Sequence, residues 1–214
     1  MSLKPLKITF NLDGRGCYFD PFTPIHLDDL IASCLNAING GSGLTRDDKP
    51  EDLRLPLGKW HIKSQWGWHA SALIPDSEDA ISMQWIRKKF RESRTHLTKG
   101  SVSLGSGIYR EFNIPTPLSM ISKFTSYALG DRHTLLSLLK RNIKFLGKKR
   151  SIGYGKVSSI DGEVIESDYS VIKDGLAMRF LPDENGLRLV RVRPPYFHPF
   201  ERINCCEVGD NYEL

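Results

Sequence analysis

The stretch LKITFNL at residues 6–12 alternates apolar and polar side chains along its whole length. A period of two is typical of a strand with one buried face, because successive side chains of a strand point to opposite sides of the sheet. We therefore predict a first strand at residues 6–12. Its four apolar side chains would face the core: Leu6, Ile8, Phe10 and Leu12.

Two helices are predicted from apolar side chains that recur at helical spacing, one within residues 25–41 and one over residues 131–146. Asp28 and Asp29 stand in the first turn of the first helix, where the helix dipole favours anions. Gly147 follows the second helix directly and provides a left-handed stop.

Further strands are predicted on both sides of the second helix. Residues 60–75 carry Trp60, Trp66 and Trp68 at one parity, and buried area is the commonest use of tryptophan. Residues 156–168 predict two strands with a turn at Asp161-Gly162. The other extended runs lie at residues 108–114, 176–182 and 186–197. Residues 81–99 are so rich in cations that their pattern does not distinguish a helix from a strand.

The resulting order is strand, helix, strand pair, helix and strand, with further strands after it. This order predicts an α+β fold of the ferredoxin-like kind that carries insertions. We expect one domain over residues 1–214, with a basic inserted thumb or loop region at about 81–118. A fold of this kind presents one open sheet face, and many RNA-binding proteins meet RNA with that face or its loops.

Composition indicates a globular protein, with 40% hydrophobic residues and a mean hydropathy of -0.32 over 214 residues. Neither an apolar run of membrane-spanning length nor a signal peptide is evident, so we expect a cytoplasmic protein without a membrane partner. The four cysteines lack the spacing of a zinc site and are expected as reduced thiols, two of them in the core. We predict no metal site and no cofactor.

Charge is concentrated in the middle of the chain. Residues 1–85 carry 8 Lys/Arg and 11 Asp/Glu, residues 86–156 carry 16 and 3, and residues 157–214 carry 6 and 11. The net charges are therefore -3, +13 and -5, which add up to the +5 of the whole chain. A field of this density favours a polyanionic partner, because each phosphate contact releases a counterion.

Residues 147–157, GKKRSIGYGKV, join three consecutive cations to two glycines around a tyrosine. A P-loop would need glycine where Arg150 stands and Ser or Thr where Val157 stands. A dinucleotide loop would need glycine at Ser158 and would enter a helix, whereas this stretch is expected to follow one. Glycine, tyrosine and cations together suit an RNA chain. Short basic glycine loops also occur as plain turns, so both interpretations stay open.

Three stretches in this order resemble the RAMP superfamily of CRISPR proteins: PIHLDDLIA at 24–32, GSGIYREFNIPTPL at 105–118 and GKKRSIGYGKV at 147–157. More narrowly, the chain resembles the small type IV subunit that binds the 5′ handle of the CRISPR RNA (crRNA). The resemblance implies a ferredoxin-like, RRM-like domain with a glycine-rich loop and a basic thumb. It also implies crRNA, larger RAMP backbone subunits and other effector subunits as partners.

The expected RNA-binding residues lie in the two basic segments. Cations for phosphate contacts are Arg87, Lys88, Lys89, Arg91, Arg94, Arg110, Lys148, Lys149, Arg150 and Lys156. The glycine-rich loop contributes Gly153 and Gly155, and base stacking is expected from Tyr154 and Tyr109. On this interpretation the protein is a non-catalytic subunit that grips the 5′ handle and caps a filament of larger subunits.

Two other functions compete with this one. The first is a metal-independent endoribonuclease that processes precursor crRNA, which would need a general base and a general acid. Its candidates are His26, where some processing relatives keep a histidine, and His96 with Lys99 in the basic region. A structural role at the entry to the first helix is the favoured interpretation of His26. The second alternative is a scaffold whose basic middle binds an acidic protein.

Overall fold

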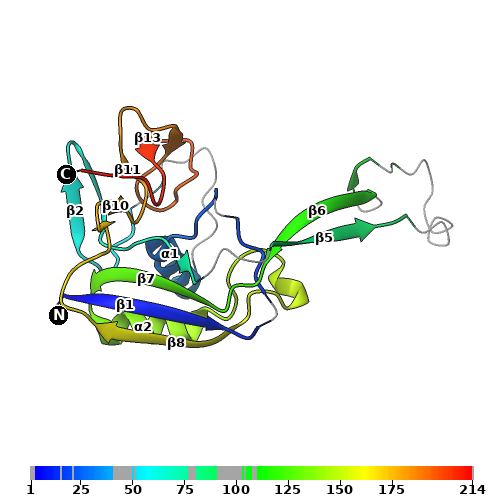
Figure 1. The fold of residues 1–214 in the computed structure, drawn as a ribbon, viewed down its shortest axis with the longest axis horizontal. Helices are drawn as coiled ribbons and strands as arrows, with labels where there is room; N and C mark the ends of the chain where they lie inside the picture. Colours follow the sequence, from blue (N-terminus) through cyan, green and yellow to red (C-terminus); the bar gives the residue numbers. More distant parts are fainter. Residues whose placement is uncertain are drawn as a thin grey trace.

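The computed structural model describes residues 3–14, 16–20, 22–40, 50, 52–76, 81–90, 103, 105–107 and 110–213, with backbone only at 81, 116 and 117. Its main sheet is antiparallel and has the strand order β4-β7-β1-β8. These strands are β1 (Lys4–Leu12), β4 (Ile74–Pro75), β7 (Lys123–Gly130) and β8 (Val157–Val164). Figure 1 shows this sheet in the body of the molecule, with a long hairpin projecting from it.

The predicted first strand is confirmed, and β1 is an interior strand of the sheet. Leu6, Ile8 and Phe10 are buried, while the side chains between them are partly exposed. The buried face packs against α1 (Leu27–Ile38) and α2 (Arg132–Asn142) in one apolar cluster. The mixed helix-and-strand class is therefore confirmed, with antiparallel sheets throughout the described residues.

The second helix is shorter than the sequence predicts. Asp131 caps α2 by accepting from the amide of Thr134 at 2.9 Å, but the helix ends at Asn142 instead of residue 146. Residues 144 and 146 instead bond to the chain at the start of β8. Lys144 O accepts from Val157 N at 2.9 Å, and Leu146 N donates to Gly155 O at 2.7 Å. Helical spacing continues to 146, but these tertiary hydrogen bonds replace the helical ones.

The predicted turn at Asp161-Gly162 is wrong, because β8 runs unbroken from Val157 to Val164. The glycine serves packing instead. A Cβ on Gly162 would lie 2.8 Å from Cδ2 of Leu136, so the missing side chain lets α2 approach the sheet closely.

Residues 81–88, which the sequence left open, form strand β5 (Ile81–Lys88). It pairs with β6 (Phe112–Ser119) in an antiparallel register that runs from Ile81 opposite Ser119 to Lys88 opposite Phe112. This two-stranded hairpin, called the arm below, projects away from the main sheet (Figure 1). The prolines of β6 suit a two-stranded hairpin, because a strand with one free edge tolerates residues without an amide proton.

The C-terminal part of the chain builds a second core over the first helix. Its strands are β9 (Ile172–Lys173), β10 (Leu176–Ala177), β11 (Leu181–Pro182), β12 (Arg188–Val190) and β13 (Ile203–Cys206), accompanied by the hairpin β2 (Lys59–Ile62) and β3 (Gln65–Trp68). Trp60 belongs to this second core and Trp68 to the first, as predicted for buried tryptophans. All four cysteines are free and buried, two more than expected.

Arg179 joins the two cores. Its side chain is fully buried and donates to Asp28 at 3.1 Å, to the hydroxyl of Tyr196 at 2.6 Å and to the carbonyl of Val192 at 2.7 Å. It also donates to the carbonyls of β3 and the residues after it, including Ala70 at 2.8 Å. The two terminal nitrogens of the guanidinium make all of these hydrogen bonds, whereas its buried Nε has no partner among the described residues. The bonds tie α1 to the C-terminal strands.

Candidate nucleic-acid interface

The glycine loop, defined here as residues 147–156, is anchored to the chain that follows β1. Lys148 N donates to Tyr18 O at 3.0 Å, and Gly155 N donates to Gly16 O at 2.9 Å. A Cβ on Gly155 would lie 1.9 Å from the carbonyl oxygen of Leu146, and its φ is +65°. Glycine is therefore required there so that two chain segments can pack against each other.

The two glycines expected to meet RNA, Gly153 and Gly155, use their amides inside the protein. Gly153 N donates to Arg150 O at 3.0 Å and closes the short 3-10 helix η3 (Arg150–Ile152). With Gly155 N bonded to Gly16, the amides of both glycines that the sequence assigned to RNA already have partners inside the protein. Of the loop's groups that the sequence assigned to RNA, the cationic side chains therefore remain as candidates for phosphate contacts.

Four cations on the loop are exposed: Lys148, Lys149, Arg150 and Lys156. Two of them make long ion pairs, Lys148 with Asp20 at 3.7 Å and Lys156 with Asp13 at 3.7 Å. Exposed pairs of this kind contribute at most about 1 kcal/mol. The ammonium groups therefore remain available to an anion such as a phosphate.

Tyr154 links the glycine loop to the base of the arm. Its hydroxyl donates to Gln84 Oε1 at 3.0 Å, and the hydroxyl of Tyr18 donates to the same oxygen at 2.8 Å. The two tyrosine rings meet edge to face, with their centroids 4.7 Å apart. Burial and the neighbouring Tyr154 raise the pKa of Tyr18, which keeps its hydroxyl protonated as a donor. Tyr154 is half-buried, and its hydroxyl is bonded to the base of the arm. Less of its ring is therefore available for the base stacking that the sequence predicts.

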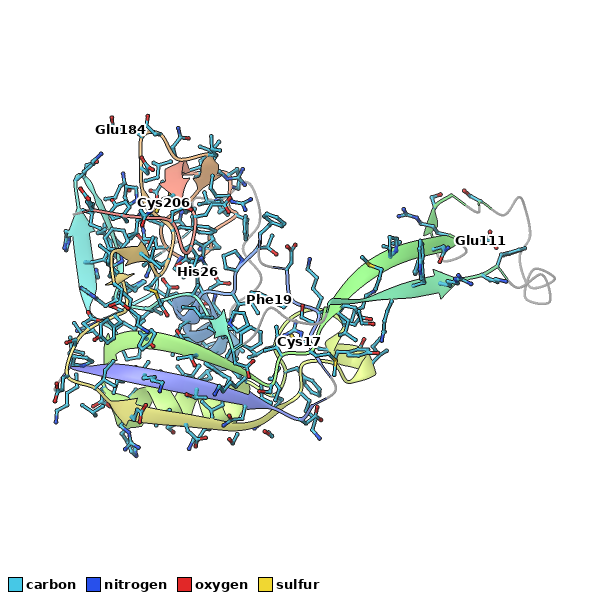
Figure 2. The ribbon with its side chains drawn as sticks, in the orientation of Figure 1. Cys17, Phe19, His26, Glu111, Glu184 and Cys206 are labelled. Carbon is cyan, nitrogen blue, oxygen red and sulfur yellow. The ribbon has the colours of Figure 1, made fainter. Side chains whose placement is uncertain are left out.

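The arm carries exposed cations and exposed apolar side chains together. Arg87, Lys88, Lys89 and Arg110 are exposed, and Arg87 Nε donates to Asn113 at 3.0 Å. Trp85 is 54% exposed and Met83 is 56% exposed. Trp85, Met83 and Arg87 share one face of β5, because side chains two residues apart point to the same side. Figure 2 shows Glu111 far out on the arm and Cys17 near its base.

Five predicted residues lie outside the part of the chain that the structure describes: Arg91, Arg94, His96, Lys99 and Tyr109. Their roles stay predictions.

His26 lies inside the body of the molecule (Figure 2). Only 2% of it is exposed, and its ring stacks on that of Tyr196 with centroids 4.1 Å apart. Neither ring nitrogen has a hydrogen-bond partner among the described residues. Burial, and then the charge of Arg179, lower its pKa well below the ordinary value, so the ring is neutral at pH 7.

The open face of the main sheet differs from the loop and the arm. Thr9, Asp161 and Glu163 project from it together with Lys7 and Lys123, and Lys7 pairs with Glu163 at 3.0 Å. Asp161 accepts hydrogen bonds from Asn11 at 3.0 Å and from Ser159 at 3.0 Å. Charges of both signs are therefore mixed on this face, whereas exposed cations predominate on the loop and the arm. Within the described residues, no group of three His, Cys, Asp or Glu side chains could hold a metal ion.

The comparison with protein families decides where the chain belongs. A family described as CRISPR type IV associated protein Csf3 matches residues 4–105 and 80–207. The chain belongs to the Csf3 family. Association with type IV CRISPR systems implies work in a multisubunit complex. Comparison with curated proteins finds no match. Among the described residues of this Csf3 family member, every helix is too short or too polar to cross a bilayer.

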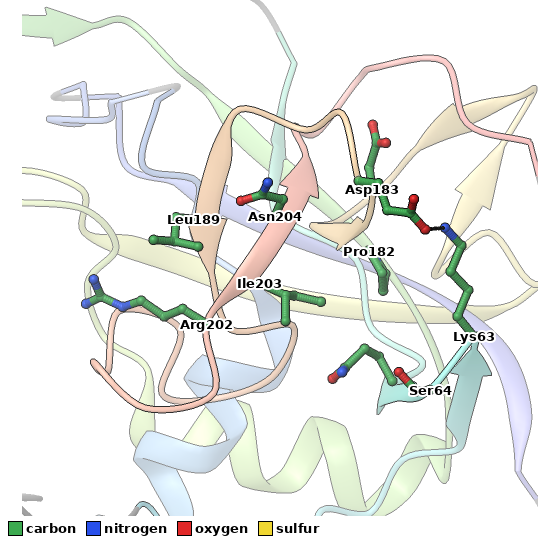
Figure 3. Close-up of a pocket in the computed structure, with 10 residues that line it drawn as sticks. Lys63, Ser64, Pro182, Asp183, Leu189, Arg202, Ile203 and Asn204 are labelled. Carbon is green, nitrogen blue, oxygen red and sulfur yellow. Dashed lines mark hydrogen bonds and ion pairs between the residues drawn. The ribbon is translucent and has the colours of Figure 1, made fainter.

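This Csf3 family member has a hollow, which is lined by residues outside the glycine loop. Its volume is about 470 Å³, and it lies between the β2–β3 turn and strands β11, β12 and β13. Figure 3 shows Lys63 reaching across its edge, where the ammonium pairs with Glu184 at 2.9 Å. Cations and acids are mixed around this hollow, which distinguishes it from the glycine loop.

Sequence reasoning missed three residues of the candidate interface in this Csf3 family member: Tyr18, Gln84 and Trp85. Trp85 stands two residues before the cations Arg87, Lys88 and Lys89, and that neighbourhood was a usable signal. Gln84 lies 66 residues from Tyr18 and 70 from Tyr154. No local pattern marks a glutamine whose importance comes only from two remote tyrosines.

Proposed function

We propose that this chain is a non-catalytic crRNA-binding subunit of a type IV CRISPR ribonucleoprotein, of the Cas5-like kind. It grips the repeat-derived 5′ handle and caps a filament of larger RAMP backbone subunits. The observation that supports this most is the contact of Tyr18 and Tyr154 with Gln84. That contact holds two cationic segments, distant in sequence, beside each other where a single strand could touch both.

The strand order supports the finer fold that goes with this function. A helix follows β1, another precedes β8, and the order β4-β7-β1-β8 is the ferredoxin-like arrangement, which RRM domains share. The arm interrupts the connection from β4 to β7 and corresponds to the thumb of a RAMP domain. RRM domains stack bases on sheet aromatics, whereas the polar open face here favours binding by the loop and the arm.

The proposal includes that the subunit does not cleave RNA, and the buried position of His26 supports this part of it. Metal-independent RNA cleavage needs a general base within hydrogen-bond reach of the attacking hydroxyl. An imidazole that is 2% exposed and stacked on Tyr196 would have to leave the core to reach an RNA strand.

Binding of the labelled repeat RNA of its own CRISPR locus, measured in EDTA at several salt concentrations, tests the proposal. Replacing Lys148 and Arg150 by Ala should weaken binding and reduce the salt slope by about 1.4, because each lost contact to a single strand removes about 0.7. Lys4→Ala with Lys63→Ala is the matched control. It removes two exposed cations at the opposite end of the molecule, as β1 and β2 in Figure 1 show.

Each outcome has a definite meaning. Equal affinities for the loop variant and the control would remove the glycine loop from the site. A wild-type protein that binds no RNA but binds an acidic protein would support the scaffold instead. A discrete RNA product that disappears in His26→Ala would establish the endoribonuclease.

A further inference from the structure

A small hollow lies directly beside the glycine loop. It has a volume of about 240 Å³ and lies between the chain entering α1 and the chain leaving α2. Its walls are largely apolar and come from both segments: Phe19, Ile25, Leu30, Phe145 and Leu146. Phe19, Ile25 and Leu30 are only partly buried, so these side chains keep apolar surface that the core does not use.

Polar and charged groups surround this apolar interior. They are Asp20, Thr23, Lys148 and Arg150. Asp20 Oδ1 accepts from the amide of Phe22 at 3.1 Å, and Oδ2 lies 3.7 Å from the ammonium of Lys148. The carboxylate is therefore held in place and retains acceptor capacity, because an ionised carboxylate has about four acceptor sites.

Two more hollows continue from this one along the end of α2. The next has a volume of about 370 Å³ and shares Phe145 and Arg150 with the first. A third, of about 260 Å³, shares Ile143 and Lys144 with the second and extends to Lys140 and the start of β8. Because neighbouring hollows share lining residues, the three lie next to one another along the end of α2, and they are together called the groove below.

Cations outnumber acids along this groove. It is lined by Lys140, Lys144, Lys148 and Arg150, against Asp20 and Asp161. Both acids are engaged, Asp20 with Lys148 and Asp161 with Asn11 and Ser159. A positive groove that contains an aromatic ring has the features of single-strand binding sites.

We infer that the hollow beside Phe145 receives one unpaired base of the RNA, while the strand's phosphates run over Arg150 and on past Lys144 and Lys140. This inference rests on the proposed function, which supplies the RNA strand. Stacking on an aromatic ring tolerates any base, but Asp20 at the rim adds an acceptor. A base with an amino or imino donor on its exposed edge is therefore favoured.

The size of the hollow supports a base rather than a larger ligand. Pockets for drug-sized molecules have volumes of about 300–1,000 Å³. The 240 Å³ beside Phe145 is smaller and suits a single flat ring whose sugar and phosphate stay outside. Lys148 and Arg150 stand at the rim, where that phosphate would lie.

An abasic scan tests this inference on the full-length protein. One abasic nucleotide is moved along the labelled repeat RNA, and the affinity is measured at each position. Wild type should lose about tenfold at one position, because a stacked base contributes on that order. In Phe145→Leu, which keeps an apolar side chain but loses the aromatic ring, intact RNA should bind about tenfold more weakly, and the abasic change at that position should cost nothing further.

Phe197→Ala serves as the control, because Phe197 is an exposed phenylalanine of the C-terminal region, outside the groove. It should reproduce the wild-type scan. Lys140→Ala with Lys144→Ala should weaken binding of every RNA in the scan and lower the salt slope by about 1.4. Thermal melts of all variants check that they are folded.

Two failures are distinguishable. A wild-type protein that binds no RNA would refute the proposed function. If it binds RNA but no position is sensitive to base removal, or if Phe145→Leu shows the wild-type abasic loss, the base pocket is refuted while the RNA-binding function stands.

Discussion

Gly155 illustrates how one residue acquires a role that its sequence context does not show. Its place in a basic glycine stretch suggests close approach of a phosphate. The structure uses the missing side chain for a contact between the glycine loop and Leu146, and its amide for Gly16. At the residue scale, the loop's glycines position the cations, and the proposed function assigns the contact with RNA to those cations.

Gly155→Ala should therefore destabilise the fold. The added Cβ meets a backbone oxygen at 1.9 Å, and the backbone is left-handed at φ +65°. We expect a loss of more than about 2 kcal/mol in the free energy of unfolding, measured by denaturant titration. Gly40→Ala is the matched control, with φ +66° and open space around the added atom. It should lose only about 1 kcal/mol, and equal losses would contradict the packing role.

Trp85 is the residue of the arm best suited to stack on a base. Because its side chain is 54% exposed, Trp85→Ala should change the free energy of unfolding by less than about 0.5 kcal/mol. RNA affinity should fall about tenfold, and Trp85→Phe should restore most of it, since both rings stack. Fluorescence anisotropy with labelled repeat RNA measures this. Equal affinity of Trp85→Ala and wild type would show that the tryptophan serves another contact.

At the scale of elements, the arm and the glycine loop are joined by a hydrogen bond at the base of the arm. The arm extends away from the sheet, whereas its base is held by the Gln84 side chain between two tyrosines (Figure 1). Secondary structure alone would leave a two-stranded hairpin marginally stable. The tyrosines therefore help to fix its direction relative to the loop.

Deleting the outer part of the arm tests whether RNA binding depends on the arm while the rest of the fold is kept. Trp85 lies directly opposite Pro115, so residues 86–114 can be replaced by Asn-Gly, a sequence that favours a two-residue hairpin turn. The deletion leaves Gln84 and the buried Leu118 in place, so the melting temperature should shift by only a few degrees. It removes seven cations and two acids, so both RNA affinity and the salt slope should fall. An unchanged slope would exclude the arm from the RNA path.

At the scale of the whole molecule, two apolar cores share a buried polar junction. Arg179 and Asp28 pair there at 3.1 Å with neither side chain exposed, and Tyr196 donates to Asp28 at 2.8 Å. Breaking one member of such a set leaves an uncompensated buried charge, which is strongly destabilising. The same junction packs against His26, whose ring lies within the protein without a hydrogen bond among the described residues.

This junction makes stability depend on pH. Burial and Arg179 lower the pKa of folded His26 well below 6.5, so the unfolded chain binds a proton that the folded chain does not. The stabilising contribution is complete above about pH 6.5 and is lost as the pH falls below it. His26→Phe, which keeps a ring against Tyr196, should remove this contribution. Its free energy of unfolding should therefore fall less steeply between pH 7 and pH 5, by up to about 1.4 kcal/mol per pH unit.

The pH profile of His26→Phe must be compared with that of wild type, because Asp29 titrates in the same pH range. Burial, and then the charge of Asp28, raise the pKa of Asp29 to about 6, which opposes the effect of His26 as the pH falls. That effect is present in both proteins and cancels in the difference. Parallel pH profiles for wild type and His26→Phe would contradict the prediction.

The first strand, both helices and the buried tryptophans Trp60 and Trp68 could be predicted because their information is local. Alternation in LKITFNL and the apolar stripe of α1 are properties of a dozen residues or fewer. The charge of +13 between residues 86 and 156 is likewise a property of composition. Together they restrict the function to classes that meet polyanions or acidic partners.

Local patterns were insufficient where other segments compete with local preference. The end of α2, the strand through Gly162 and the half-buried position of Tyr154 depend on partners outside their own elements: on residues 155–157, Leu136 and Gln84. Local patterns carry no information about such partners. The sequence by itself therefore determined the elements and the charge. Only the tertiary structure decided which cations share a surface and which histidine is buried, because long-range packing sets both.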